Sequence, residues 1–316
     1  MTDTARPSLW TRFGPTISTL ALLGYVGSQI DLKALGVALQ QVTWPSFVLL
    51  TVTSTIALLL ADGIALRQVY SDFVCPVTYR QVVLLRGASY LPQLVNYHVG
   101  QAWLAWYAAR AYGVGLGRVA GATLLVYATV FGGLFLFGTC AYLLRPNSLE
   151  GLGSALLAIG SAAVGYGLLL VWRPRWLTRI PVASVLLEAG VLGNLRALAF
   201  RLPHVAVLFL GMWLPFSLFG VKIPLADALL YVPLLMLVGA LPFTPQGIGT
   251  RDALALRILA PLAPTAAEQA AVAATTLSWA VGMTLVQCII SPWMLAASRR
   301  LLATKGILDD ERTLNG

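Results

Sequence analysis

The chain has 316 residues, of which 58% are hydrophobic and only 10% are charged. Soluble domains carry about 25% charged residues, so this composition excludes an ordinary soluble protein and indicates a membrane protein with several spans. We attribute the net charge of +9 to basic residues in cytoplasmic loops beside anionic lipid, and we expect no nucleic-acid partner. Three scattered cysteines and two histidines favour neither a disulfide framework nor a metal site, and we expect no cofactor.

Six apolar segments have about the length that a helix needs to cross a bilayer, ~20 residues. The first follows Arg6 and Arg12, and we interpret it as a retained span rather than a signal peptide, because no cleavage signal follows it. The predicted spans are residues 14–30, 45–66, 119–144, 152–172, 202–220 and 270–297.

Two further apolar regions are interrupted by prolines and glycines. The first, residues 80–110, breaks at residues 91–100, and the second, residues 224–261, breaks at residues 241–252. Proline removes a backbone donor and glycine permits unusual backbone angles, so both breaks predict the end of a helix. The arms are shorter than ~17 residues, which favours two re-entrant helical hairpins over the alternative of two pairs of tilted full spans.

The two halves of the chain have the same layout. Residues 14–150 contain three spans and one hairpin, and residues 151–298 contain three spans and one hairpin again. An odd number of crossings in each half gives the halves opposite orientations, which is the inverted-repeat architecture of secondary transporters. The predicted fold class is therefore an all-α polytopic membrane protein with about six full spans, two re-entrant hairpins and an inverted repeat.

The basic residues predict the orientation in the membrane. With the N-terminus inside, the outer segments hold only Lys33, Arg145 and Lys222, whereas most arginines fall in inner segments. We therefore predict a multi-pass protein of the cell inner (plasma) membrane with two cytoplasmic tails, residues 1–13 and 299–316. The connection at residues 173–201 holds five arginines and is predicted to be a basic amphipathic segment on the inner leaflet.

Arg251 and Asp252 follow the glycines of the second break. The helix that begins after Gly249 presents unpaired N–H groups and a positive dipole end, which suit an anion, and Arg251 offers a planar fork for two phosphate oxygens. Asp252 either stabilises the start of this helix or orients Arg251 and carries a coupling proton. The alternative interpretation is an external loop in which both charges are solvated.

Polar residues also surround the first break. Asn96 and His98 lie within it, Gln101 directly follows it, and Arg86 lies on the arm before it. A single histidine in a membrane is more often a structural hydrogen-bonding group than a proton carrier. Asp62 in the second span requires a partner for its charge, and Arg86 is the candidate.

The segment LPFTPQGIGTRDALAL, residues 241–256, resembles a motif of the lysylphosphatidylglycerol synthase transmembrane-region family, also called the flippase-like domain family. That motif usually reads P-x-x-P-G-G-x-G-x-R-E. The upstream segment LPQLVNYHVGQAWLAWYAAR resembles the first conserved block of the family, L-P-G-x-x-G-(D/E)-x-x-R. Gln246 stands where glycine is usual and Asp252 where glutamate is usual, while the first block lacks its acidic residue and has Gln101 nearby.

The resemblance covers roughly residues 14–300 and implies the lipid-translocating membrane part without the soluble aminoacyl-transferase domain of the larger synthases. At the positions that match the motif, the resemblance implies functional roles for Pro245, Gly247, Gly249, Arg251 and Asp252. The complete predicted substrate-binding set adds Gln246, Asn96, His98, Gln101 and Arg86.

The predicted function is a lipid flippase that moves an anionic lipid or lipid-linked intermediate between leaflets by alternating access. We expect membrane lipids as partners, with a homo-oligomer or a separate lipid-modifying enzyme as further candidates. No catalytic constellation, phosphate-binding loop or dinucleotide fingerprint is visible in the sequence, so we do not expect an enzyme. The alternatives are an intramembrane transferase acting on a lipid-linked substrate, a small-anion permease and a membrane scaffold without transport.

Overall fold

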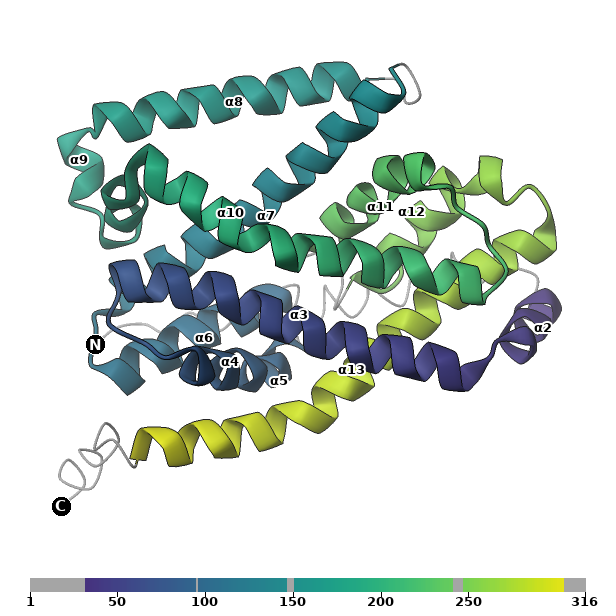
Figure 1. The fold of residues 1–316 in the computed structure, drawn as a ribbon, viewed down its shortest axis with the longest axis horizontal. Coiled ribbons are helices and arrows are strands. Elements are labelled where there is room, and N and C mark those ends of the chain that lie inside the picture. The colour runs from purple at the N-terminus through teal and green to yellow at the C-terminus, as the bar shows by residue number, and fades with distance from the viewer. Residues whose placement is uncertain (1–31, 95, 147–150, 241–246, 304–316) are drawn as a thin grey trace, which may run out of the picture.

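The computed structural model describes residues 32–94, 96–146, 151–240 and 247–303 (Figure 1). All regular elements in these ranges are helices, which confirms the predicted all-α class. The helices are α2 (Leu32–Gln41), α3 (Trp44–Phe73), α4 (Tyr79–Ala88), α5 (Tyr90–Gln93), α6 (Tyr97–Tyr112), α7 (Leu116–Leu144), α8 (Leu152–Trp172), α9 (Arg175–Thr178), α10 (Pro181–Leu218), α11 (Leu225–Ala240), α12 (Thr250–Ile258) and α13 (Ala266–Ala303), with a 3-10 turn at Ala260–Leu262.

Five helices are long and apolar enough to cross a membrane: α3, α7, α8, α10 and α13. They contain the predicted spans 45–66, 119–144, 152–172 and 270–297, and most of 202–220. These helices confirm a polytopic membrane protein. The predicted first span, residues 14–30, lies outside the described residues, and the number of spans and the inverted repeat stay predictions.

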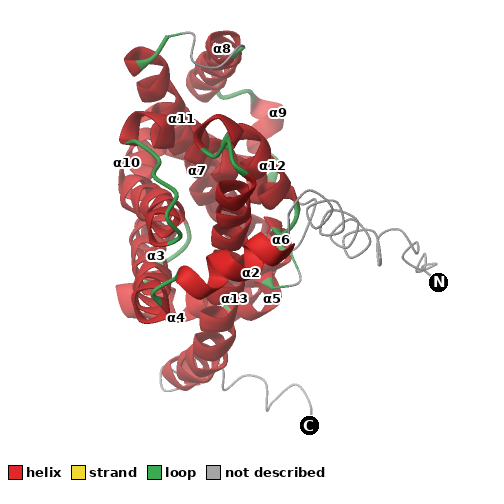
Figure 2. Ribbon diagram, turned by 90° about the vertical axis from the view of Figure 1, so that its right-hand side faces the viewer, coloured by secondary structure: helices red, strands yellow, loops and turns green. Residues whose placement is uncertain are grey.

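Helix α10 is the central element of the packing. It lies along α7 and α3, and the three helices hold much of the buried apolar surface between them (Figure 1). A methyl group at Gly121 of α7 would overlap the backbone carbonyl of Val182 in α10, so only glycine allows this close approach. In contrast, α8 lies at the edge of the molecule and is largely uncovered by other helices (Figure 2).

The predicted breaks occur in the structure. Helix α5 ends at Gln93 and α6 begins at Tyr97, while α11 ends at Ala240 and α12 begins at Thr250. Helix α4, with 10 residues, and α12, with 9 residues, are shorter than the ~20 residues of a full crossing. Both short helices pack against α13, so the two interrupted regions meet around one long helix.

The predicted basic segment, residues 173–201, extends into α10. Two helical parts of α10 meet at a kink at Gly190, which has φ of 59°, and the second part runs on into the predicted span 202–220. Arg201, the last residue of the predicted segment 173–201, is 2% exposed, and Asp62 of α3 compensates its charge inside the protein. The cytoplasmic position of this segment stays a prediction.

Candidate functional site

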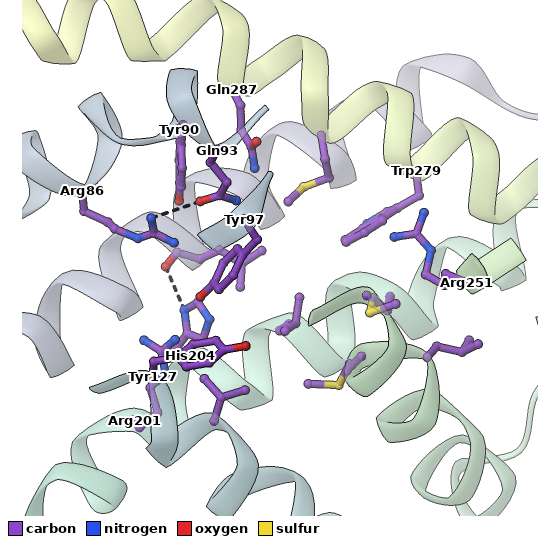
Figure 3. A pocket seen from close by; sticks show the side chains of 18 residues that line it. Arg86, Tyr90, Gln93, Tyr97, Tyr127, Arg201, His204, Arg251, Trp279 and Gln287 are labelled. Carbon is purple, nitrogen blue, oxygen red and sulfur yellow. Dashed lines mark hydrogen bonds between the residues drawn. The ribbon is translucent and has the colours of Figure 1, made fainter. Parts of the chain in front are cut away.

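A cavity of about 140 Å³ lies where the two interrupted regions meet α3, α7, α10 and α13 (Figure 3). Part of its wall is polar or aromatic, formed by Arg86, Tyr90, Gln93, Tyr97, Tyr127, Arg201, His204, Arg251, Trp279 and Gln287. The rest is apolar, formed mainly by Leu58, Val130, Leu208, Met212, Leu235, Met236 and Met283. The cavity therefore combines cationic groups with a hydrophobic surface.

Arg251 forms one side of the cavity. It is 3% exposed, its Nη2 donates a hydrogen bond to the backbone oxygen of Thr276 at 3.1 Å, and its guanidinium lies 5.1 Å from the ring centre of Trp279. Its Nε has no hydrogen-bond partner among the described residues. The alternative of a solvated external loop does not fit this burial. Arg251 is instead a buried cation whose Nε–H donor has no hydrogen-bond partner among the described residues.

Asp252 stabilises the backbone turn that positions Arg251. One carboxylate oxygen accepts a hydrogen bond from the N–H of Gly249 at 2.8 Å, and the other lies 3.9 Å from Nη2 of Arg251. Gly249 has φ of 87° and Gly247 has φ of 71°, and both values favour glycine. A methyl group on Gly247 would also lie 2.9 Å from the Cα of Gly239 in α11. The glycines thus allow the turn, and Asp252 fixes its end.

Arg86 and Arg201 form the other side of the cavity and share one carboxylate. One oxygen of Asp62 accepts from Nε of Arg86, and the other accepts from Nη1 of Arg201. The predicted pairing of Asp62 with Arg86 is confirmed. Arg86 also donates to Ser89 at 2.8 Å and to Gln93 at 3.1 Å. Two buried guanidiniums against one buried carboxylate give this cluster a net positive charge.

His204 and Arg201 are site residues that the sequence analysis missed. They are three positions apart on α10 and therefore share one helix face. Nδ1 of His204 lies 3.3 Å from the backbone oxygen of Leu58, and Figure 3 shows its ring beside Tyr97 and Tyr127. The available sequence signal for these two site residues is their position at the start of the apolar segment 202–220. The same position is typical of the boundary of a membrane span.

The three polar residues predicted near the first break lie outside the cavity lining. Asn96 begins α6, since its side chain accepts a hydrogen bond from the N–H of His98 at 2.8 Å. His98 is exposed, and its ring is 5.9 Å from that of Tyr127. Gln101 interacts with Tyr97, which does line the cavity. Pro245 and Gln246 lie outside the described residues, so a binding role for these five residues stays a prediction.

The charges around the cavity favour an anion. Three arginines face two carboxylates, those of Asp62 and Asp252, which leaves one positive charge in excess. The described residues contain no cluster of three or more His, Cys, Asp or Glu side chains that would hold a metal ion. A phosphate or carboxylate group suits these donors, because arginine recognises the oxygens of both with charge-assisted hydrogen bonds.

Comparison with known proteins assigns the chain to a family. No curated protein and no solved structure matches it. The family described as "Lysylphosphatidylglycerol synthase TM region" matches residues 13–290, which include both interrupted regions and every residue of the cavity wall. This match indicates a multi-pass membrane protein involved in lipid handling. The chain therefore belongs to the lysylphosphatidylglycerol synthase transmembrane-region family, as the motifs at the two helix breaks predicted.

Proposed function

We propose that this protein is a lipid flippase that moves an anionic lipid, or a lipid-linked intermediate, between the leaflets of the inner membrane. The phosphate of the headgroup binds in the cavity, and the acyl chains stay in the bilayer. The protein binds and moves the lipid without altering its covalent bonds. Membrane lipids are its partners, together with either a second copy of the chain or a separate enzyme that modifies the lipid.

One observation carries this proposal: the two interrupted regions bring two buried arginines, Arg86 and Arg251, to opposite sides of the same cavity (Figure 3). Charged side chains inside membrane proteins are costly, and they mark substrate pathways when they face a cavity. Helices that break within the membrane are typical of transporter binding sites. The apolar part of the wall, with Leu58, Leu235 and Met283, suits the hydrocarbon next to a headgroup.

The proposed transport cycle uses alternating access. Binding of the headgroup compensates the excess positive charge, and movement of one half of the chain against the other exposes the cavity first to one leaflet and then to the other. The short helices α4 and α12 are the elements whose packing on α13 changes in this cycle. Both termini lie on the cytoplasmic side in this scheme, as the distribution of basic residues predicts.

Reconstitution into vesicles tests the proposal. The vesicles contain a trace of fluorescent phosphatidylglycerol, and a membrane-impermeant quencher reports the fraction in the outer leaflet over time. Arg251→Gln removes one charge-assisted contact, which is worth ~1.5–3 kcal/mol, so we expect the translocation rate to fall about 10- to 100-fold. The matched control is Arg196→Gln, because Arg196 is exposed and pairs with Asp72 at 3.3 Å away from the cavity.

Unchanged lipid translocation in Arg251→Gln would refute the role given to this arginine. A covalently altered lipid recovered from the vesicles would favour the intramembrane transferase instead. Uptake of inorganic phosphate without any lipid movement would favour the small-anion permease.

A further inference from the structure

The cavity wall offers hydrogen-bond donors to an anion but no carboxylate to a cation. Its arginines are Arg86, Arg201 and Arg251, and none of its described residues is Asp or Glu. The Nε atoms of Arg201 and Arg251 are buried without a hydrogen-bond partner in the described part of the chain. Arginine keeps its proton in proteins, so these donors stay charged. An anionic ligand would supply the acceptor that they lack.

Neither of the two nearby carboxylates is part of the cavity wall. Asp62 accepts from both Arg86 and Arg201. Asp252 is fully buried: Oδ2 accepts from the N–H of Gly249, and Oδ1, which has no hydrogen-bond partner among the described residues, lies 3.9 Å from Nη2 of Arg251. Residues 241–246, which the structure does not describe, read LPFTPQ and therefore supply no acidic side chain. An ammonium group of a ligand in this cavity would face arginine without a counterion, and an unpaired buried charge is costly.

The family is named after lysylphosphatidylglycerol, and this lipid differs from phosphatidylglycerol in the charge of its headgroup. Phosphatidylglycerol has an anionic phosphate diester, whereas its lysyl ester adds two ammonium groups and becomes a net cation. The excess positive charge of the cavity attracts the first headgroup and repels the second. Like-charge contacts of this kind reduce the affinity for the wrong partner and so create specificity.

We propose that the cavity selects lipids with an unmodified anionic phosphate headgroup and rejects their cationic, aminoacylated forms. This chain thereby handles the substrate of an aminoacylation reaction rather than its product. The inference takes from the proposed function only that the ligand is a lipid. Inorganic phosphate shares the recognised chemistry, so the experiment includes it as the competing source.

A binding measurement tests the selectivity without requiring transport. The full-length protein in detergent is incubated with equal amounts of phosphatidylglycerol and lysylphosphatidylglycerol, washed, and the retained lipids are quantified by mass spectrometry. We expect at least a ~10-fold preference for phosphatidylglycerol, which corresponds to ~1.4 kcal/mol. Equal retention, preference for the lysyl form, or retention of neither lipid overturns the inference.

Two further measurements are a translocation assay in vesicles and a competition with inorganic phosphate. Preferential binding of phosphatidylglycerol without translocation in vesicles removes the proposed flippase function and leaves the selectivity intact. Displacement of phosphatidylglycerol by an equal concentration of inorganic phosphate overturns the assignment to a lipid, and persistence of the bound lipid supports it.

A charge variant provides the gain-of-function test. Gln287 lies on the cavity wall in α13 and is buried, so Gln287→Glu adds a carboxylate there with little change of shape. We expect the ratio of retained lysylphosphatidylglycerol to phosphatidylglycerol to rise about 10-fold. The matched control is Gln41→Glu at the exposed end of α2, which leaves the ratio unchanged. An unchanged ratio in folded Gln287→Glu contradicts the inference, and if that variant does not fold, the wild-type preference decides.

Discussion

Replacing Asp62 by asparagine is expected to destabilise the protein strongly. Asp62 lies on α3 with 3% exposure, and its carboxylate holds Arg86 of α4 and Arg201 of α10. Asparagine keeps the shape of the side chain but removes the charge, so two buried guanidiniums lose their counterion. Breaking a buried ion pair by removing one partner costs ~3–5 kcal/mol. That loss is a large share of the ~5–15 kcal/mol by which domains are stable.

A second substitution separates the loss of charge balance from the loss of shape. In Asp62→Asn with Arg201→Gln, only Arg86 stays without a carboxylate, and Arg86 still donates to Ser89 and Gln93. We therefore expect the double variant to recover about half of the lost stability, ~1.5–2.5 kcal/mol, because one of two uncompensated charges is gone. Additive losses in the double variant would contradict this reasoning.

Thermal unfolding in detergent ranks the stability of the variants. It is monitored as the fraction of protein that stays monodisperse at each temperature. We expect the wild type to be most stable, followed by the double variant and then by Asp62→Asn. Asp72→Asn is the control, because its pair with Arg196 is partly exposed and worth only ~0–1 kcal/mol. If Asp62→Asn unfolds at the same temperature as this control, the shared carboxylate does not stabilise the fold as argued.

Two further substitutions test the side of the cavity that contains the second helix break. Gly247→Ala places a methyl group 2.9 Å from a neighbouring backbone in a left-handed conformation, so we expect a loss of ~1–2 kcal/mol in thermal unfolding. Gly165→Ala in α8 meets no atom within 4 Å and is expected to be neutral or slightly stabilising in the same measurement. Trp279→Leu removes the ring below Arg251, and we expect a 2- to 10-fold slower lipid translocation, from a cation–π contact of ~0.5–1.5 kcal/mol. Trp293→Leu on the exposed side of the same helix is expected to leave the rate unchanged.

In the proposed function, the excess positive charge links the stability of the protein to the binding of its ligand. Asp62 compensates two arginines only in part, and the compensation leaves Nε of Arg201 without an acceptor among the described residues. A phosphate in the cavity would approach that donor and compete with Asp62 for the guanidinium. In the proposed function, binding of a headgroup is thereby coupled to the packing of α3 against α10 through Arg201, and the headgroup biases the arrangement of these helices.

The sequence alone determined the class of the protein, the position of four spans and the two helix breaks. These features are local: hydropathy over ~20 residues sets a span, and proline and glycine set a break wherever they occur. The motif around Arg251 also identified the family, because its residues are contiguous in the chain. The pairing of Asp62 with Arg86 was predictable as well, since both charges lie within apolar segments and an acid inside a membrane requires a partner.

Only the tertiary structure decided which residues form the cavity. Arg201 is 139 positions from Asp62, and its place at the start of an apolar segment is equally typical of a cytoplasmic boundary. No local pattern distinguishes a charge that faces water from one that meets a partner inside the protein. His204, Tyr127 and Trp279 join the wall for the same reason: the packing of α10, α7 and α13 brings them together, and packing depends on contacts between distant parts of the chain.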